Sequence, residues 1–335
     1  MCIRDRSCGV GYPPEREHDL LALQHLAIAE RDVAQSALGH DALDGGLRND
    51  SDAALRQRLR QPVAQIIVRS GKIQGVALEN GDEIHAPVVV SSLDPRRTFT
   101  KIMDPADLPP KLVTAARNFK IRGSSGKLNI ALDGLPHFNG LDQRSPLMLG
   151  DMHFIDSLER MERAYDDWKA GTWSADPYVD MLIPTQVDPT MAPPGKHMMT
   201  VFVQYCPPTL AGGDWTDADR DAFGKTVIDQ IAEYSPDFKD LILHAEVRTP
   251  RELEEEVGLT EGNIFMGELT FDQLLFNRPF PGYAQYRGPV QGMYLCGSGS
   301  HPGGGVMAAP GANCAREILL DLKRPALVPG SYADD

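Results

Sequence analysis

A glycine-rich segment near the C-terminal end holds the residues best suited to bind an anionic ligand. Five of the nine residues from Gly297 to Gly305 are glycine, and the segment lies between a short apolar run and a helix-forming run. Glycine lets backbone amides approach a ligand closely, and a helix start offers unpaired N–H groups with partial positive charge. We predict that this segment binds a phosphate or a reduced flavin ring, although ordinary strand-to-helix connections also contain glycines.

Three side chains in and beside this segment are chemically active types. His301 is a candidate proton carrier, but a loop histidine followed by proline also commonly serves in packing or hydrogen bonding. Cys296 and Cys314 lack the Cys-x-x-Cys spacing of a redox pair. We therefore expect both cysteines to act as small buried apolar residues.

Two stretches with the pattern of an α/β fold should position these residues. Residues 292–296 read as a strand, and the helix after the loop has Pro310 in its first turn, where proline is tolerated. Its predicted buried face holds Gly311, Ala315, Ile318, Leu319 and Leu322.

The other signature begins at Val63. Alternating β-branched residues and the turn pair Asn80-Gly81 predict a three-stranded meander, which continues into a buried strand at 87–92. Behind that strand, Asp94, Arg96 and Arg97 are interpreted as a solvated turn, with a hinge or a cofactor-edge contact as the alternative.

Residues 101–285 read as an α+β region. Strands are predicted at 128–132, 179–183 and 198–205, and a helix should follow Thr216, with Asp219 in a capping arrangement. A second helix should bury one face made of Ile155, Leu158, Tyr165 and Trp168. The aromatic residues are expected in the core, with an apolar substrate channel as the alternative: Tyr165, Trp168, Trp173, Phe202 and Tyr205.

Composition excludes several classes of protein. With 335 residues and 42% hydrophobic residues, the chain can bury a sizeable core, and its net charge of −14 argues against nucleic acid or anionic lipid as a main partner. Five scattered cysteines suggest neither a disulfide framework nor a metal site, so a reducing compartment is expected. No apolar run is long enough to span a bilayer.

The motifs together resemble a known family. Residues 292–307 (GMYLCGSGSHPGGGVM) look like the C-terminal signature of the phytoene desaturase-like carotenoid and retinoid oxidoreductases, and most resemble the pyridine nucleotide-disulfide oxidoreductase domain-containing protein 2 group. The resemblance covers roughly 63–325. It also rests on the meander 63–86, on 89–99 (VVSSLDPRRTF), on 127–136 (KLNIALDGLP), on 262–265 (GNIF) and on 278–282 (RPFPG).

The resemblance implies an α/β fold. A partial FAD/NAD(P)-binding Rossmann-like domain of the glutathione-reductase type would comprise 63–100 and 286–325, interrupted by an α+β substrate domain at 101–285, with a tail at 326–335. FAD would be the cofactor. It would be held by residues that match the family pattern, namely Val63, Gly297, Ser298, Gly299, Gly304, Gly305, Val306 and Met307.

The implied activity is oxidation of C–H bonds in an apolar small-molecule substrate, with oxygen or a quinone as electron acceptor. The resemblance also implies a cytoplasmic location in a bacterium, or the mitochondrial matrix as in eukaryotic relatives, and it allows peripheral membrane contact. Alternatives are a non-catalytic interaction module of the same fold and a flavin amine oxidase.

The chain departs from the family at its beginning. Relatives open with a strand, a Gly-x-Gly-x-x-Gly turn and a helix that hold the diphosphate, whereas Gly9 and Gly11 here follow no strand pattern. Residues 1–62 are therefore assigned to no domain, and this stretch of the sequence is possibly an artefact. We expect an N-terminally incomplete flavoprotein. The loop also offers only Ser298 where wider relatives place an acidic residue near the ribityl chain.

Overall fold

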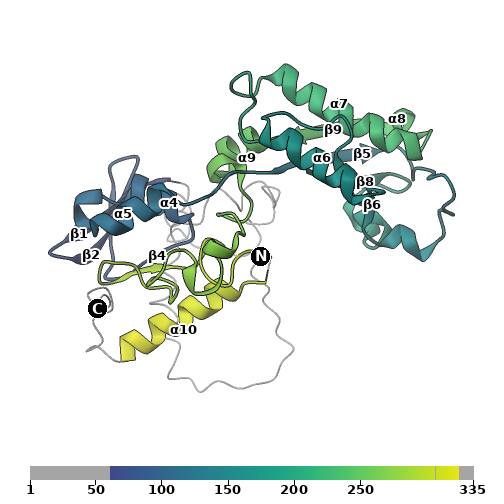
Figure 1. The fold of residues 1–335 in the computed structure, drawn as a ribbon. Coiled ribbons are helices and arrows are strands. Elements are labelled where there is room, and N and C mark those ends of the chain that lie inside the picture. The colour runs from purple at the N-terminus through teal and green to yellow at the C-terminus, as the bar shows by residue number, and fades with distance from the viewer. Residues whose placement is uncertain (1–60, 306, 324–335) are drawn as a thin grey trace, which may run out of the picture. The chain divides into compact units, whose positions relative to one another are not determined.

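A computed structural model of the chain describes residues 61–305 and 307–323 (Figure 1). Within these ranges the chain forms two compact units. Unit 1 comprises 61–118, 274–302 and 307–323, and unit 2 comprises 119–273 and 303–305. Among the described residues, no helix combines the length and the apolar character needed to cross a membrane.

Unit 1 contains the predicted meander. Its antiparallel strands are β1 (Val63–Arg69), β2 (Lys72–Leu78) and β3 (Glu83–His85). The connection between β2 and β3 includes Gly81 with a φ of 89°, a conformation that glycine adopts without strain. The turn pair in the sequence therefore predicted this hairpin correctly.

Two parallel strands connect the meander to the glycine-rich loop. Strand β10 (Met293–Leu295) pairs in register with β4 (Val89–Ser91), and both are short and largely buried. The amide of Ile73 in β2 donates to the carbonyl of Gln291 at 2.9 Å, so the meander continues into this pair. A parallel pair followed by a helix is the predicted α/β signature, which is confirmed.

The segment behind β4 corrects one prediction. Three short helical turns and one α-helix follow the strand. The turns are α4 (Pro95–Arg97), the π-helical η3 (Thr98–Ile102) and η4 (Pro105–Asp107), and the helix is α5 (Pro110–Arg117). Asp94 is buried, and its carboxylate accepts a hydrogen bond at 2.8 Å from the amide of Arg97. The interpretation as a solvated turn was wrong for Asp94, because this carboxylate caps α4 inside the unit.

The helix after the loop is α10 (Ala309–Lys323), with Pro310 in its first turn as predicted. Its buried face was predicted correctly only for Ile318, which is buried; Ala315, Leu319 and Leu322 are exposed, and Cys314 is buried in their place. The buried face of α10 is rotated from the predicted one toward Asp321. This carboxylate accepts hydrogen bonds from Arg287 and from the Tyr294 hydroxyl.

Unit 2 is built on a five-stranded antiparallel sheet in the order β6-β7-β8-β5-β9. The strands are β5 (Ser125–Leu132), β6 (Met152–Phe154), β7 (Tyr178–Leu182), β8 (His197–Gln204) and β9 (Ile242–Arg248). In β5, Leu128, Ile130 and Leu132 alternate toward the core and are fully buried. The three strands predicted for this region are confirmed.

The longer helices of unit 2 are α6 (Leu158–Lys169), α7 (Asp217–Tyr234), α8 (Phe238–Leu241) and α9 (Pro250–Val257). Helix α7 begins with the predicted capping box of Thr216 and Asp219. Helix α6 begins later than predicted, so Ile155 lies outside it and Leu158 is 77% exposed. Ser157 caps α6, and the buried face consists of Trp168, as predicted, together with Arg160 and Ala164.

Single helical turns fill the remaining connections: η5 (Pro146–Leu149), η6 (Pro184–Gln186), η7 (Pro189–Met191), η8 (Thr260–Gly262), η9 (Phe271–Gln273) and η10 (Leu275–Asn277). The core of unit 2 packs the sheet against α7 through Phe223, Val227 and Ile231, all fully buried.

Candidate functional site

The predicted loop residues lie between β10 and α10 in the chain. Gly297, Ser298 and Gly299 follow β10 directly, and Gly304, Gly305 and Met307 precede α10. Met307 is exposed, and Val306 lies outside the described residues. Val63 begins β1 and pairs with Leu78 in the three-stranded sheet, so two different sheets hold Val63 and the loop.

Gly297 has a structural reason to be glycine. A Cβ at this position would lie 2.1 Å from the Ser92 carbonyl oxygen and 2.8 Å from its carbon. The chain leaving β10 passes this closely over the end of β4, where the Cys296 amide donates to the Ser91 carbonyl at 2.9 Å. Gly297 therefore shapes the path of the loop, whether or not it also contacts a ligand.

A buried arginine holds the first half of the loop. Arg278 is fully buried, and its Nε donates to the Ser298 carbonyl at 2.9 Å. Burial lowers the pKa of its guanidinium to about 10, which still leaves the group charged at neutral pH. The sequence placed Arg278 in a family motif but gave no sign of this contact, which joins residues twenty positions apart.

A second clamp holds the loop at His301. The Tyr286 hydroxyl donates to the His301 carbonyl at 2.8 Å and accepts a hydrogen bond from Asn313 of α10, also at 2.8 Å. Burial raises the pKa of Tyr286, so the phenol stays protonated and able to donate at neutral pH. The main chain of the loop is therefore fixed on both sides of Ser300.

The imidazole of His301 is left without a partner. Its Nδ1 atom is buried, and within the described part of the chain nothing donates to it or accepts from it. A buried polar atom without a hydrogen bond costs about 1 to 3 kcal/mol, so such an atom commonly faces a missing ligand or an ordered water. Protein atoms already cover Nδ1 in the ligand-free chain, so this atom does not by itself indicate an external partner.

The two cysteines beside the loop are not a thiolate pair. Cys314 is buried, and burial raises its pKa to about 12, so the thiol stays protonated. Cys296 is half-buried and packs against the same small cluster. The predicted role of Cys314 as a buried apolar residue is confirmed.

The aromatic residues of unit 2 that were expected in the core are buried only in part: Trp168 is buried, whereas the other four are half-buried, namely Tyr165, Trp173, Phe202 and Tyr205. Trp168 is buried and stacks on Tyr165 with ring centroids 5.4 Å apart. Trp173 stacks on Trp215 at the same centroid distance, and both rings meet Phe223 edge-on. Tyr205 also contacts Tyr165 and Trp168, so ring packing accounts for four of the five aromatic residues and leaves Phe202 unexplained.

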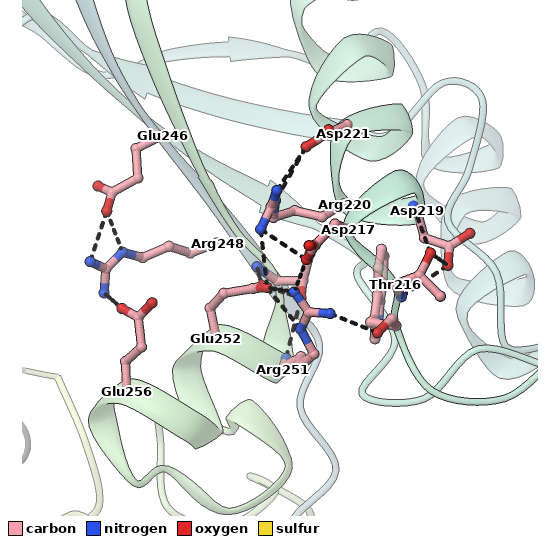
Figure 2. A network of polar contacts seen from close by, with 12 residues as sticks. Thr216, Asp217, Asp219, Arg220, Asp221, Glu246, Arg248, Arg251, Glu252 and Glu256 are labelled. Atoms are coloured by element: carbon pink, nitrogen blue, oxygen red, sulfur yellow. Dashed lines mark hydrogen bonds and ion pairs between the residues drawn. The ribbon is translucent and has the colours of Figure 1, made fainter.

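A polar network ties α9 to the start of α7 (Figure 2). Glu252 is buried and accepts hydrogen bonds from the amide of Thr249 at 2.8 Å and from Nε of Arg251 at 2.9 Å. Arg251 also reaches Asp217 and the Trp215 carbonyl, both at 2.8 Å. The network fixes α9 against the start of α7.

Another polar cluster lies on the outer strands of unit 2. His153 of β6 is the direct cross-strand partner of Asp180 in β7, and Asp151 precedes β6. One ligand-type atom from each of the three lies within 4.8 Å of the others, a geometry that could hold a divalent cation. The sequence gave no sign of this group, because strand pairing brings together residues far apart in the chain.

This cluster predicts a pH effect on stability. Burial raises the pKa of Asp180 to about 6, and a hydrogen bond with Asp151 adds to the shift. A carboxyl group with a raised pKa in the folded state stabilises the fold when protonated, so stability should fall as pH rises from about 4 to about 6. The change Asp180→Asn should therefore stabilise unit 2 at pH 7.5 by about 1 kcal/mol.

Urea unfolding followed by tryptophan fluorescence at pH 4.0 and pH 7.5 measures this effect. All three tryptophans lie in unit 2, so the signal reports that unit. The exposed Asp240→Asn on α8 is the matched control and should behave like the unchanged chain at both pH values. An Asp180→Asn effect of equal size at both pH values would contradict the prediction.

A surface hollow of about 440 Å³ lies elsewhere in unit 1. Residues from β2, β3 and the turns beside them line it, including Ile73, His85 and Gln291. None of the predicted site residues lines this hollow, so it adds no support to the loop as a ligand site.

We compared the chain with known proteins. No family model matches the chain. It is 40% identical over 273 residues to Pyridine nucleotide-disulfide oxidoreductase domain-containing protein 2 of Mus musculus, covering 78% of this chain and 46% of that protein. A limonene dehydrogenase polypeptide of Castellaniella defragrans is 26% identical over 78% of this chain and 50% of its own length.

Phytoene desaturase of Neurospora crassa is 24% identical over 89% of this chain and 50% of its own length. The chain thus spans about half the length of the curated relatives it matches. These matches confirm the predicted resemblance of the chain to the phytoene desaturase-like proteins and to the pyridine nucleotide-disulfide oxidoreductase domain-containing protein 2 group.

Proposed function

We propose that the whole protein is an FAD-dependent oxidoreductase that oxidises C–H bonds of an apolar small molecule. The similarity to relatives named as an oxidoreductase-domain protein, a dehydrogenase and a desaturase supports the reaction class. Two of these names specify hydrocarbon substrates, limonene and phytoene, which supports an apolar substrate. The curated relatives give the flavin amine oxidase alternative no better support.

The observation that supports the cofactor is the glycine-rich loop between the parallel strand β10 and helix α10. FAD fits this setting because its diphosphate suits glycine-rich backbone beside a helix start. In this proposal Gly297, Ser298 and Gly299 lie along the diphosphate and ribityl chain.

The remaining proposed contacts follow the family pattern. Gly304, Gly305, Val306 and Met307 lie toward the flavin ring, and the backbone of Val63 meets the adenine. The described glycines at 303 and 305 have φ values of 108° and 128°, conformations that a side chain would strain. A backbone without side chains leaves room for a planar ring to approach.

When bound, FAD supplies the hydride-accepting chemistry of the reaction. The residues of the chain orient the cofactor and keep water out. Arg278 and Tyr286 donate to the carbonyls of Ser298 and His301, so the ligand meets a preformed backbone in the first part of the loop. Oxygen or a quinone would serve as the electron acceptor, and the cytoplasm is the proposed location in a bacterium, with peripheral membrane contact to reach an apolar substrate.

Flavin retention tests the proposal. The purified chain is incubated with excess FAD, desalted and examined by visible absorbance, with riboflavin in a parallel sample. A second sample is a longer chain with a restored N-terminal strand, Gly-x-Gly-x-x-Gly turn and helix; we expect this chain to keep the FAD bands, to keep riboflavin less well because riboflavin lacks the diphosphate, and to keep more FAD than the unextended chain. Anaerobic addition of limonene or phytoene should then bleach the bands. Loss of FAD on desalting from both chains would argue against the cofactor, and capture of a protein by the flavin-free chain would favour the interaction-module alternative.

A further inference from the structure

The outer strands of unit 2 bring two carboxylates and one imidazole together. His153 of β6 pairs directly with Asp180 of β7, and Asp151 lies one position before β6. The neighbours of Asp180 along β7, Val179 and Met181, are both buried in the core. Side chains alternate along a strand, so Asp180 points to the opposite face of the sheet. The three polar groups therefore meet where a cation from solvent can reach them.

Within the described residues, no lysine or arginine forms an ion pair with the two carboxylates of this cluster. Their ion pairs are with His153, whose Nε2 lies 4.0 Å from Asp151 and whose Nδ1 lies 3.8 Å from Asp180. Burial, and then the hydrogen bond and charge of Asp151, raise the pKa of Asp180 to about 6. Glu246 and Glu252 of the same unit each contact an arginine instead. The cluster thus differs from its neighbours in lacking a permanent positive charge.

A tyrosine orients the imidazole of this cluster. The Tyr178 hydroxyl forms a hydrogen bond with Nδ1 of His153, and the two rings stack with centroids 5.6 Å apart. When Nδ1 carries the proton and donates to this hydroxyl, the lone pair of Nε2 is free on the side of Asp151. Metal-binding histidines are held in this way through their second ring nitrogen. Tyr178 therefore sets the ring in an orientation that suits a ligand.

We propose that Asp151, His153 and Asp180 bind a divalent cation, and that zinc fits these ligands best. Two carboxylate oxygens and one imidazole nitrogen match a zinc site with three protein ligands and a water. The three ligand atoms lie within 4.8 Å of one another. Neighbouring ligands of tetrahedral zinc lie about 3.4 Å apart, so these partly exposed side chains need only small shifts. The cation would join the short edge strand β6 to β7, a role that goes beyond the proposed function and does not depend on flavin.

Zinc should reverse the effect of Asp180→Asn on stability. In metal-free buffer at pH 7.5, this change relieves the repulsion between two carboxylates and stabilises unit 2. At zinc concentrations of about 100 times the dissociation constant, the unchanged chain gains stability from binding, whereas Asp180→Asn lacks one ligand and gains much less. The stability order of the two chains should therefore invert as zinc is added.

Cobalt distinguishes this site from cysteine ligands elsewhere in the chain. Cobalt bound to thiolate gives an intense charge-transfer band in the near ultraviolet, whereas oxygen and nitrogen ligands give only weaker visible bands. We expect one bound cobalt with visible bands that disappear in His153→Ala and in Asp151→Asn. Tyr178→Phe should weaken this binding about ten-fold, because the ring of His153 loses its orienting partner. The exposed His244→Ala on β9 and Asp240→Asn on α8 are matched controls and should bind like the unchanged chain.

The experiment combines cobalt titrations with urea unfolding followed by tryptophan fluorescence, with and without excess zinc. Loss of the visible cobalt bands in the ligand variants but not in the controls, together with the inverted stability order, is the expected result. Equal cobalt binding by the unchanged chain and His153→Ala would overturn the proposal. It would also be overturned if zinc left the stability of the unchanged chain unaltered, or raised that of Asp180→Asn by the same amount.

Discussion

Replacing Gly297 with alanine should lower the free energy of unfolding of unit 1 by about 2 to 3 kcal/mol. The added Cβ would lie 2.1 Å from a backbone oxygen of Ser92, and backbone cannot move aside as a side-chain end can. Relief requires separating the ends of β4 and β10, which are joined by the bond from the Cys296 amide to Ser91. The same displacement moves the start of the loop, so FAD retention should fall as well.

Amide hydrogen exchange measures this effect where it arises. The amides of Val89 and Cys296, which donate to Gly292 and Ser91, should exchange faster in Gly297→Ala. Gly311→Ala is the matched control, because a Cβ there meets nothing within 4 Å and alanine favours the helix α10 by up to about 1 kcal/mol. Equal protection of β4 and β10 in both variants would refute the close-packing explanation.

Replacing Glu252 with alanine should destabilise unit 2 by about 2 to 4 kcal/mol. The carboxylate is buried, caps α9 through the Thr249 amide and pairs with Arg251 (Figure 2). Its removal leaves the amide of Thr249 without this acceptor and a partly buried guanidinium with one anion fewer. Loss of a helix cap and loss of a buried pair both reduce stability.

The pH dependence identifies the charge of Glu252 as the cause. Burial alone would raise the pKa of Glu252, but hydrogen bonds from Thr249 and Arg251 lower it overall. A lowered pKa stabilises the fold above the unfolded value of 4.5, and this contribution is lost as pH falls below it. The difference between the unchanged chain and Glu252→Ala should therefore shrink in acid.

Urea unfolding followed by tryptophan fluorescence at pH 7.5 and pH 4.0 provides the measurement. Glu255→Ala lies on the same helix at an exposed position and should change stability by less than about 0.5 kcal/mol. An effect of Glu252→Ala no larger than that of Glu255→Ala would show that the network contributes nothing measurable.

Local signals in the sequence predicted much of the fold. The pair Asn80-Gly81 predicted a hairpin because only a few residues tolerate its turn, and Thr216 with Asp219 predicted a helix start because both satisfy free amides. Pro310 marked the first turn of α10 for a similar local reason. Each of these signals depends on neighbours within a few positions, so no tertiary contact was needed to interpret it.

Features set by distant contacts could not be predicted in this way. The choice of the buried face of α10 depends on Asp321, whose hydrogen-bond partner Arg287 lies 34 residues earlier in the chain. Asp94 looked like a solvent-exposed residue because its type is usually exposed, yet it caps a buried turn. The clamp from Arg278 to Ser298 and the unpartnered Nδ1 of His301 depend on packing that composition and spacing do not encode.

Hydrogen exchange of the whole chain with and without FAD tests the central claim most directly, because it locates the ligand as well as detecting it. Saturating FAD should slow exchange in peptides from 293–305, and it should leave peptides from 146–191 of unit 2 unchanged. Protection confined to another part of the chain, with no change in the glycine-rich loop, would contradict the assignment of the loop as the cofactor site.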